Sequence, residues 1–62
     1  MPYVNIRVAG SLTEEQKANI SQGVTDVIVK EANKPAESVL IFIDEVSPGN
    51  IAKKGKLLTS SK

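Results

Sequence analysis

The fold is decided by residues 13–32, TEEQKANISQGVTDVIVKEA, whose apolar side chains recur at helical spacing. The Thr-x-x-Gln pattern that starts at Thr13 is a capping box, and two acids in the first turn complement the helix dipole. A helix is therefore predicted to begin at about Glu14 and to end near Asn33, because Pro35 cannot continue it. The side chains expected to pack on a sheet are Ile20, Val24, Val27 and Ile28, extended by Ala18 and Ala32. Those expected to point largely away are Lys17, Gln22, Asp26 and Lys30.

A strand is predicted on each side of this helix. Residues 3–8 alternate between polar and apolar side chains, which is typical of a half-buried strand. Residues 39–43 form a nearly continuous apolar run that ends in an acidic pair, and such a run suits a strand covered by a helix on one side and by a partner subunit on the other. A crossover of this length should be right-handed and place the two strands parallel, giving a β-α-β unit.

Beyond the second strand, residues 47–50, Ser-Pro-Gly-Asn, are predicted to turn, and residues 51–58 to form a short C-terminal hairpin. The whole chain, 1–62, is thus expected to be one α/β (α+β) domain. A chain of about 60 residues buries only ~60% of its unfolded surface. Because the sequence has no cysteine and no histidine, disulfides and a zinc site cannot stabilise it, and self-assembly is expected instead.

Composition excludes several classes of function. The net charge is +1, and one arginine with few aromatic residues provides neither the basic stripe nor the stacking platforms of a nucleic-acid-binding protein. No apolar run approaches the ~20 residues of a membrane span and no signal peptide is recognised, so we expect a cytoplasmic protein that does not bind membranes. The lysines near the C-terminus are best interpreted as a solvated tail, with ligand binding as the alternative. They are Lys53, Lys54, Lys56 and Lys62.

The second residue, Pro2, is the candidate catalytic group. Removal of Met1 would leave Pro2 as a free secondary amine at the start of the first strand. An α-amino group titrates near ~7.7–8.0, and partial burial disfavours its charged form, so a neutral amine is accessible at physiological pH. Such an amine is a general base or a nucleophile. The alternative is that Pro2 merely starts an edge strand, where its missing N–H does no harm.

Taken together, Met-Pro-Tyr-Val, the Thr-Glu-Glu-Gln-Lys segment, the acidic end of the second strand and the glycine-containing tail resemble the 4-oxalocrotonate tautomerase family over essentially the whole chain. The resemblance implies a tautomerase-like fold that assembles into dimers and hexamers. The expected hexamer is a homohexamer or trimer of dimers, or a heterohexamer that includes a paralogous subunit. It also implies keto–enol tautomerisation of a small molecule without a cofactor or metal. The N-terminal proline is the general base of that family, which corresponds to Pro2 here.

The family's other site residues do not carry over intact. Where one arginine binds a substrate carboxylate the sequence has Leu12, beside Ser11; where a second arginine binds the other end it has Leu40; and Ile51 replaces the aromatic residue of the pocket. A leucine cannot replace a bidentate guanidinium–carboxylate contact, so activity on dicarboxylates is in doubt. The loss of two cations also removes an influence that lowers the pKa of the proline amine.

Two sets of residues are candidates to replace the missing arginines. Lys53 or Lys54 could reach a neighbour's pocket from the hairpin, and we favour them over Arg7, which is expected to pair with an acid across a subunit interface. Three functional interpretations follow. The first is a tautomerase that uses Pro2 as base, the second a non-catalytic subunit of a tautomerase-like (hetero)hexamer, and the third a Schiff-base chemistry between Pro2 and an aldehyde.

Overall fold

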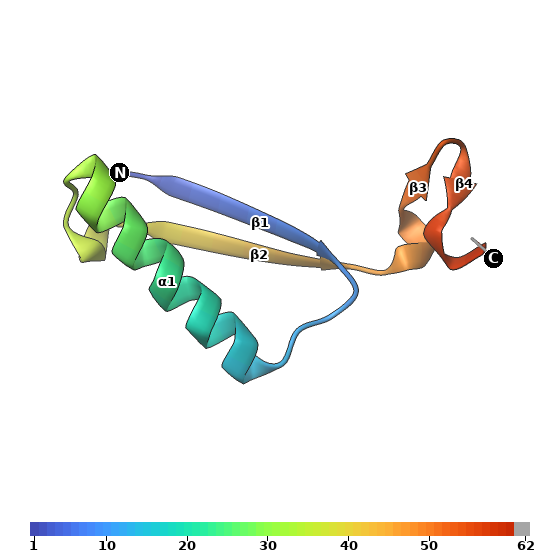
Figure 1. Ribbon diagram of the computed structural model, residues 1–62, viewed down its shortest axis with the longest axis horizontal. Helices are drawn as coiled ribbons and strands as arrows, with labels where there is room; N and C mark the ends of the chain where they lie inside the picture. The colour runs from blue at the N-terminus through green and yellow to red at the C-terminus, as the bar shows by residue number, and fades with distance from the viewer. Residues whose placement is uncertain (61–62) are drawn as a thin grey trace.

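The computed structural model describes residues 1–60, so Lys62 and the end of the predicted domain lie outside the described residues. A parallel pair of strands, β1 (Tyr3–Ala9) and β2 (Leu40–Val46), is connected by helix α1 (Glu14–Ala32) (Figure 1). A small antiparallel hairpin follows, made of β3 (Ala52–Lys53) and β4 (Lys56–Leu57). Three short 3-10 helices complete the chain: Ala36–Ser38, Pro48–Asn50 and Leu58–Ser60. The predicted fold class is therefore confirmed.

The ends of α1 form as the sequence predicts. The Thr13 side chain accepts a hydrogen bond from the Gln16 amide at 3.1 Å, and the Gln16 side chain accepts one from the Thr13 amide at 2.9 Å. These two bonds complete the capping box. At the other end Asn33 takes the left-handed conformation, with φ 59° and ψ 46°, which terminates the helix. The Ser47 side chain caps the predicted turn by accepting from the Gly49 amide.

The rotation of α1 on the sheet differs from the prediction. Val27 is 58% exposed, and Ala18 and Ala32 are exposed too, whereas Lys17 lies on the sheet side and is only partly exposed. The half-buried positions recur as neighbouring pairs such as Ile28 and Val29, and Val27 lies outside this stripe. The half-buried positions of the helix are Lys17, Ile20, Ser21, Val24, Thr25, Ile28 and Val29.

α1 covers only one face of the sheet. The covered face carries Val4, Ile6 and Val8, while the opposite face leaves Tyr3 and Phe42 exposed, in an edge-to-face contact with ring centroids 6.5 Å apart. No side chain in residues 1–59 is buried. The radius of gyration is 14.9 Å, against roughly 11 Å for a compact chain of this length. A single protomer therefore has an incomplete core. Within residues 1–60 no helix is both long and apolar enough to span a bilayer.

Candidate functional site

Pro2 lies at the head of β1, where its position is fixed by the neighbouring strand. Its carbonyl accepts a hydrogen bond from the Leu40 amide at 3.0 Å, and the ladder then pairs Tyr3 with Leu40. Pro2 is half-buried, whereas Met1 is 78% exposed. The hydrogen bond with Leu40 uses the carbonyl of Pro2 and not its nitrogen, so removal of Met1 does not break this hydrogen bond.

The remaining predicted site residues lie at the other end of the sheet. Ser11 and Leu12 follow the end of β1, and Ile51 and Lys53 follow the end of β2. The seven residues of β1, Tyr3–Ala9, span six steps of ~3.3 Å, which separate the two ends by roughly 20 Å. Figure 1 shows the N-terminus at one end of β1 and the β3–β4 hairpin beyond the other. One protomer thus brings Pro2 and Leu40 together but keeps them apart from the rest of the predicted set.

A groove occurs at this second end, where the two strands meet the Pro48–Asn50 turn. We call it the terminal groove; it has a volume of about 530 Å³ and is lined by Arg7, Val8, Ala9, Val46, Asn50, Ile51 and Ala52. Ile51 is the only lining residue that the resemblance placed in a site. The others come from two segments, residues 7–9 and 46–52, which lie about 40 residues apart in the sequence, and no motif links the segments. Residues 1–60 contain no cluster of acidic side chains placed to hold a metal ion.

Arg7 is the charged residue of the terminal groove. Its Nη2 atom contacts Asp44 Oδ2 at 3.5 Å, and the Asn5 side chain donates to the same oxygen at 3.3 Å. Parallel pairing sets Arg7 directly opposite Asp44 in the same chain. The expected pairing of Arg7 with an acid across a subunit interface stays a prediction, because the structure describes one chain. The Arg7 side chain remains 71% exposed, and the contact is single and long.

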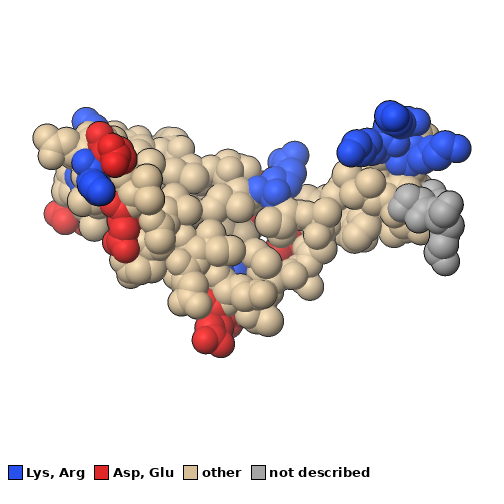
Figure 2. All heavy atoms as spheres, viewed as in Figure 1, with Lys and Arg blue, Asp and Glu red and all other residues tan. Residues whose placement is uncertain are grey.

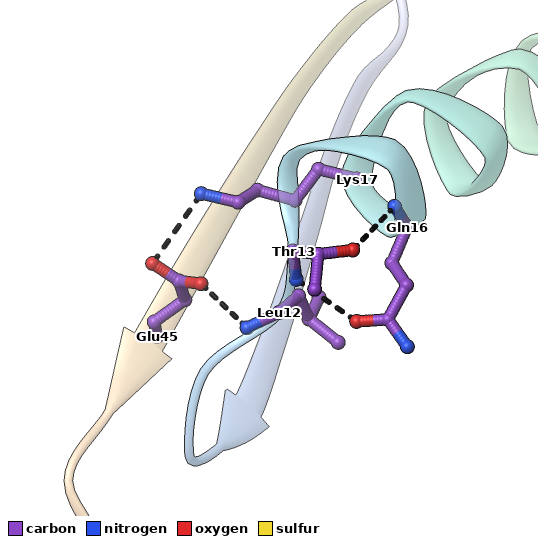
Figure 3. Close-up of polar contacts among 5 residues, drawn as sticks. All are labelled: Leu12, Thr13, Gln16, Lys17 and Glu45. Carbon is purple, nitrogen blue, oxygen red and sulfur yellow. Dashed lines mark hydrogen bonds and ion pairs between the residues drawn. The ribbon is translucent and has the colours of Figure 1, made fainter.

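The loop between β1 and α1 is tied to β2 by Glu45 (Figure 3). Glu45 Oε2 accepts a hydrogen bond from the Leu12 amide at 2.8 Å, and Oε1 contacts Lys17 Nζ at 3.5 Å. The Leu12 hydrogen bond lowers the pKa of Glu45, and the nearby Lys17 ammonium lowers it further. The Gly10 amide also donates to the Val46 carbonyl at 2.8 Å. Sequence reasoning noted the acidic pair at the end of β2 without assigning it this role.

The β3–β4 hairpin concentrates positive charge. Lys53 and Lys56 are direct partners across the ladder, and Lys54 holds a left-handed φ of 55° at the turn. Like charges directly opposite each other are unfavourable, and no acidic side chain among residues 1–60 forms a salt bridge with these lysines. Figure 2 shows the blue side chains gathered over the hairpin, with no red ones beside them on that face.

Known proteins match this chain over nearly its whole length. A family profile described as "Tautomerase enzyme" matches residues 2–60. A probable tautomerase of Bacillus cereus is 36% identical over 59 residues, covering 95% of this chain and 97% of that protein. The 2-hydroxymuconate tautomerase of Bacillus subtilis is 32% identical over 59 residues, covering 95% of each chain.

Solved structures agree with the sequence matches. The crystal structure of DmpI from Helicobacter pylori superposes with a TM-score of 0.87 at 33% identity, covering 97% of this chain and all of that one. A heterohexameric 4-oxalocrotonate tautomerase from Chloroflexus aurantiacus superposes over both complete chains with a TM-score of 0.89; its identity is 21%, so this likeness concerns the fold alone.

Proposed function

Because this chain belongs to the tautomerase family, we propose that it interconverts the keto and enol forms of a small compound, with the Pro2 nitrogen as general base after removal of Met1. Family membership gives the class of enzyme, a tautomerase-type isomerase. The choice of base is supported by one observation: Pro2 heads β1 with its carbonyl bonded to the Leu40 amide, which holds the ring at the open end of the strand.

The chemistry requires a neutral secondary amine. With Met1 attached, the Pro2 nitrogen belongs to a tertiary amide and has no basic lone pair. Once it is free, this nitrogen removes the proton from the enol oxygen and returns it to the carbon, so the product is an isomer of the substrate and no further reactant is consumed. The half-buried setting of Pro2 disfavours the charged amine.

A complete site needs two protomers under this proposal. Pro2 and Leu40 belong to one copy, and a neighbouring copy supplies the loop of Ser11 and Leu12 together with Ile51 and the lysine hairpin. The separation of about 20 Å between the two ends of one sheet supports this division. The sheet face that α1 leaves uncovered and the incomplete core of one protomer favour self-association. A solved structure with a similar fold is described as a heterohexamer.

A second function is favoured by a specific feature. Leu12 and Leu40 stand where the resemblance places two carboxylate-binding arginines. A chain with this substitution could act as a non-catalytic subunit beside a paralogue that supplies the charged residues.

One experiment separates the two functions. The purified protein is prepared in a form that keeps Met1 and in a form processed to Pro2, each verified by intact mass, and both are assayed for ketonisation of phenylenolpyruvate. We expect activity only in the processed form, with Pro2→Ala partly active because it retains a primary amine. Equal turnover by both forms would exclude the proline amine as base, and no turnover by either would favour the non-catalytic subunit.

A further inference from the structure

We infer that the terminal groove is a binding site for a small organic acid with an apolar body and one carboxylate, and that Arg7 is the ligand of that carboxylate. This inference deepens the proposed function, because the acid is taken to be the substrate of the same composite site. No contact with Pro2 is needed for the binding itself.

The lining of the groove matches such a ligand in size and polarity. Its volume of about 530 Å³ lies within the ~300–1,000 Å³ of small-molecule sites. Small-molecule sites combine a mostly apolar wall with a few polar groups that fix orientation. The apolar wall here is formed by Val8, Ala9, Val46, Ile51 and Ala52, and the polar groups by Arg7 and Asn50.

Arg7 has donors to spare for an incoming carboxylate. Asp44 contacts only its Nη2 atom, at 3.5 Å, and no other polar partner of Arg7 occurs within residues 1–60. Asp44 itself is shared, since it also accepts from Asn5. A guanidinium has five N–H donors in a planar fork, so most of the fork remains free for a bidentate contact. Asp44 orients the Arg7 side chain but leaves most of its N–H donors free.

The charges around the groove favour an anion. Beyond Ile51 the hairpin presents Lys53, Lys54 and Lys56, which have no acidic partner in the described part of the chain. The base of the hairpin is fixed to the groove, because the Leu58 amide donates to the Ile51 carbonyl at 2.9 Å. Positive charges at the mouth of a site raise the local concentration of anions. One guanidinium with no second in the groove favours a monocarboxylate over a dicarboxylate.

Binding is best tested without turnover. Protein that retains Met1 and therefore lacks the proline amine is titrated calorimetrically with 3-phenylpropionate and with 3-phenylpropanamide, its neutral analogue. We expect the carboxylate to bind at least about tenfold more tightly, as a charge-assisted hydrogen bond does. Arg7→Met should abolish this preference, and Arg7→Lys should keep part of it because the charge remains but the fork is lost.

Two further variants make the result decisive. Lys30→Met removes one positive charge from the end of α1, far from the groove, and should leave the preference intact. Ala52→Glu keeps Arg7 but adds a negative charge at the groove, so it should weaken carboxylate binding and spare the amide; this variant decides the matter if Arg7→Met does not fold. Equal affinity of wild type for the two compounds, no binding of either, or an unchanged preference in Arg7→Met or Ala52→Glu would overturn the inference. Carboxylate-selective binding without any turnover by the processed form would instead overturn the proposed function alone.

Discussion

Glu45 Oε2 lies 2.8 Å from the backbone nitrogen of Leu12 and accepts its hydrogen, which joins the end of β2 to the loop that precedes α1. The two residues are 33 positions apart, and the whole of α1 lies between them in the sequence. The capping box satisfies the amides of Thr13 and Gln16, and Glu45 provides the acceptor for the amide of Leu12, which precedes the N-cap. The Glu45 carboxylate is therefore one of the contacts that hold the Ser11–Leu12 loop, beside the bond between the Gly10 amide and the Val46 carbonyl.

Replacing Glu45 should disturb this loop only if the new side chain offers no oxygen to accept the hydrogen bond from the Leu12 amide. Glu45→Gln retains an oxygen for the Leu12 amide and should keep most of the tautomerase activity. Glu45→Ala removes it, and a displaced loop should lower kcat/KM by up to about 100-fold. The measurement is steady-state ketonisation of an enol by the processed protein. Lys17→Met is the matched control, because it breaks the 3.5 Å ion pair with Glu45 but leaves the hydrogen bond from the Leu12 amide to Glu45. Full activity in Glu45→Ala would remove any role for this contact.

Acid should release the same contact. The Leu12 amide and Lys17 lower the pKa of Glu45 in the folded protein, so its carboxylate favours the folded state at pH values above the unfolded pKa. That contribution declines as the pH falls and is lost once the pH passes through the depressed folded pKa. We expect the difference in unfolding free energy between wild type and Glu45→Gln to shrink from pH 7 to pH 3. Urea unfolding at fixed protomer concentration measures it; a constant difference would contradict the linkage.

The helix-free face of the sheet should hold the assembly together. Phe42 on that face and Val27 on the outer side of α1 are similarly exposed in one protomer, at 50% and 58%. Phe42→Glu should lower the oligomeric state at micromolar concentration, because it puts a charge into an apolar interface. Val27→Glu should not. Sedimentation velocity compares the two variants with wild type, and a Phe42→Glu protein with unchanged sedimentation would place the interface elsewhere.

Restoring arginines should recover activity on dicarboxylates. We expect wild type to process 2-hydroxymuconate poorly, and Leu12→Arg with Leu40→Arg to improve kcat/KM more than either change alone, because each guanidinium binds one end of the substrate. Since Leu12 and Leu40 lie at opposite ends of one sheet, oligomers mixed from the two single variants should also gain activity. Mixed oligomers no better than the separate variants would argue against a site shared between protomers.

The capping box should contribute measurably to stability. Thr13→Ala removes the side-chain acceptor of the Gln16 amide and should cost about 1 kcal/mol of unfolding free energy. Thr59→Ala, on another exposed threonine outside α1, is the control and should be nearly neutral. Both are measured by urea unfolding at one protomer concentration, because the stability of a self-associating protein varies with its concentration. Equal effects of the two changes would show that the cap does not limit the stability of α1.

The sequence by itself determined the order of the elements and where α1 begins and ends. These features depend on local rules: the alternation in residues 3–8, the capping box at Thr13 and the left-handed conformation that Asn33 tolerates. The rotation of α1 was predicted less well, since the apolar spacing fits both Val27 and Ile28. Only packing against the sheet turned Ile28 inward and left Val27 in solvent.

Only the tertiary structure decided which residues lie together at each end. Parallel pairing sets the start of β1 against the start of β2, so Pro2 bonds Leu40, and it sets their ends side by side, so Arg7 lies opposite Asp44 and the terminal groove forms beside Ile51. Glu45 reaches Leu12 for the same reason. Contacts between residues more than 30 positions apart depend on strand register and on the path of the crossover, and those are fixed by burial of the whole β-α-β unit rather than by any local pattern.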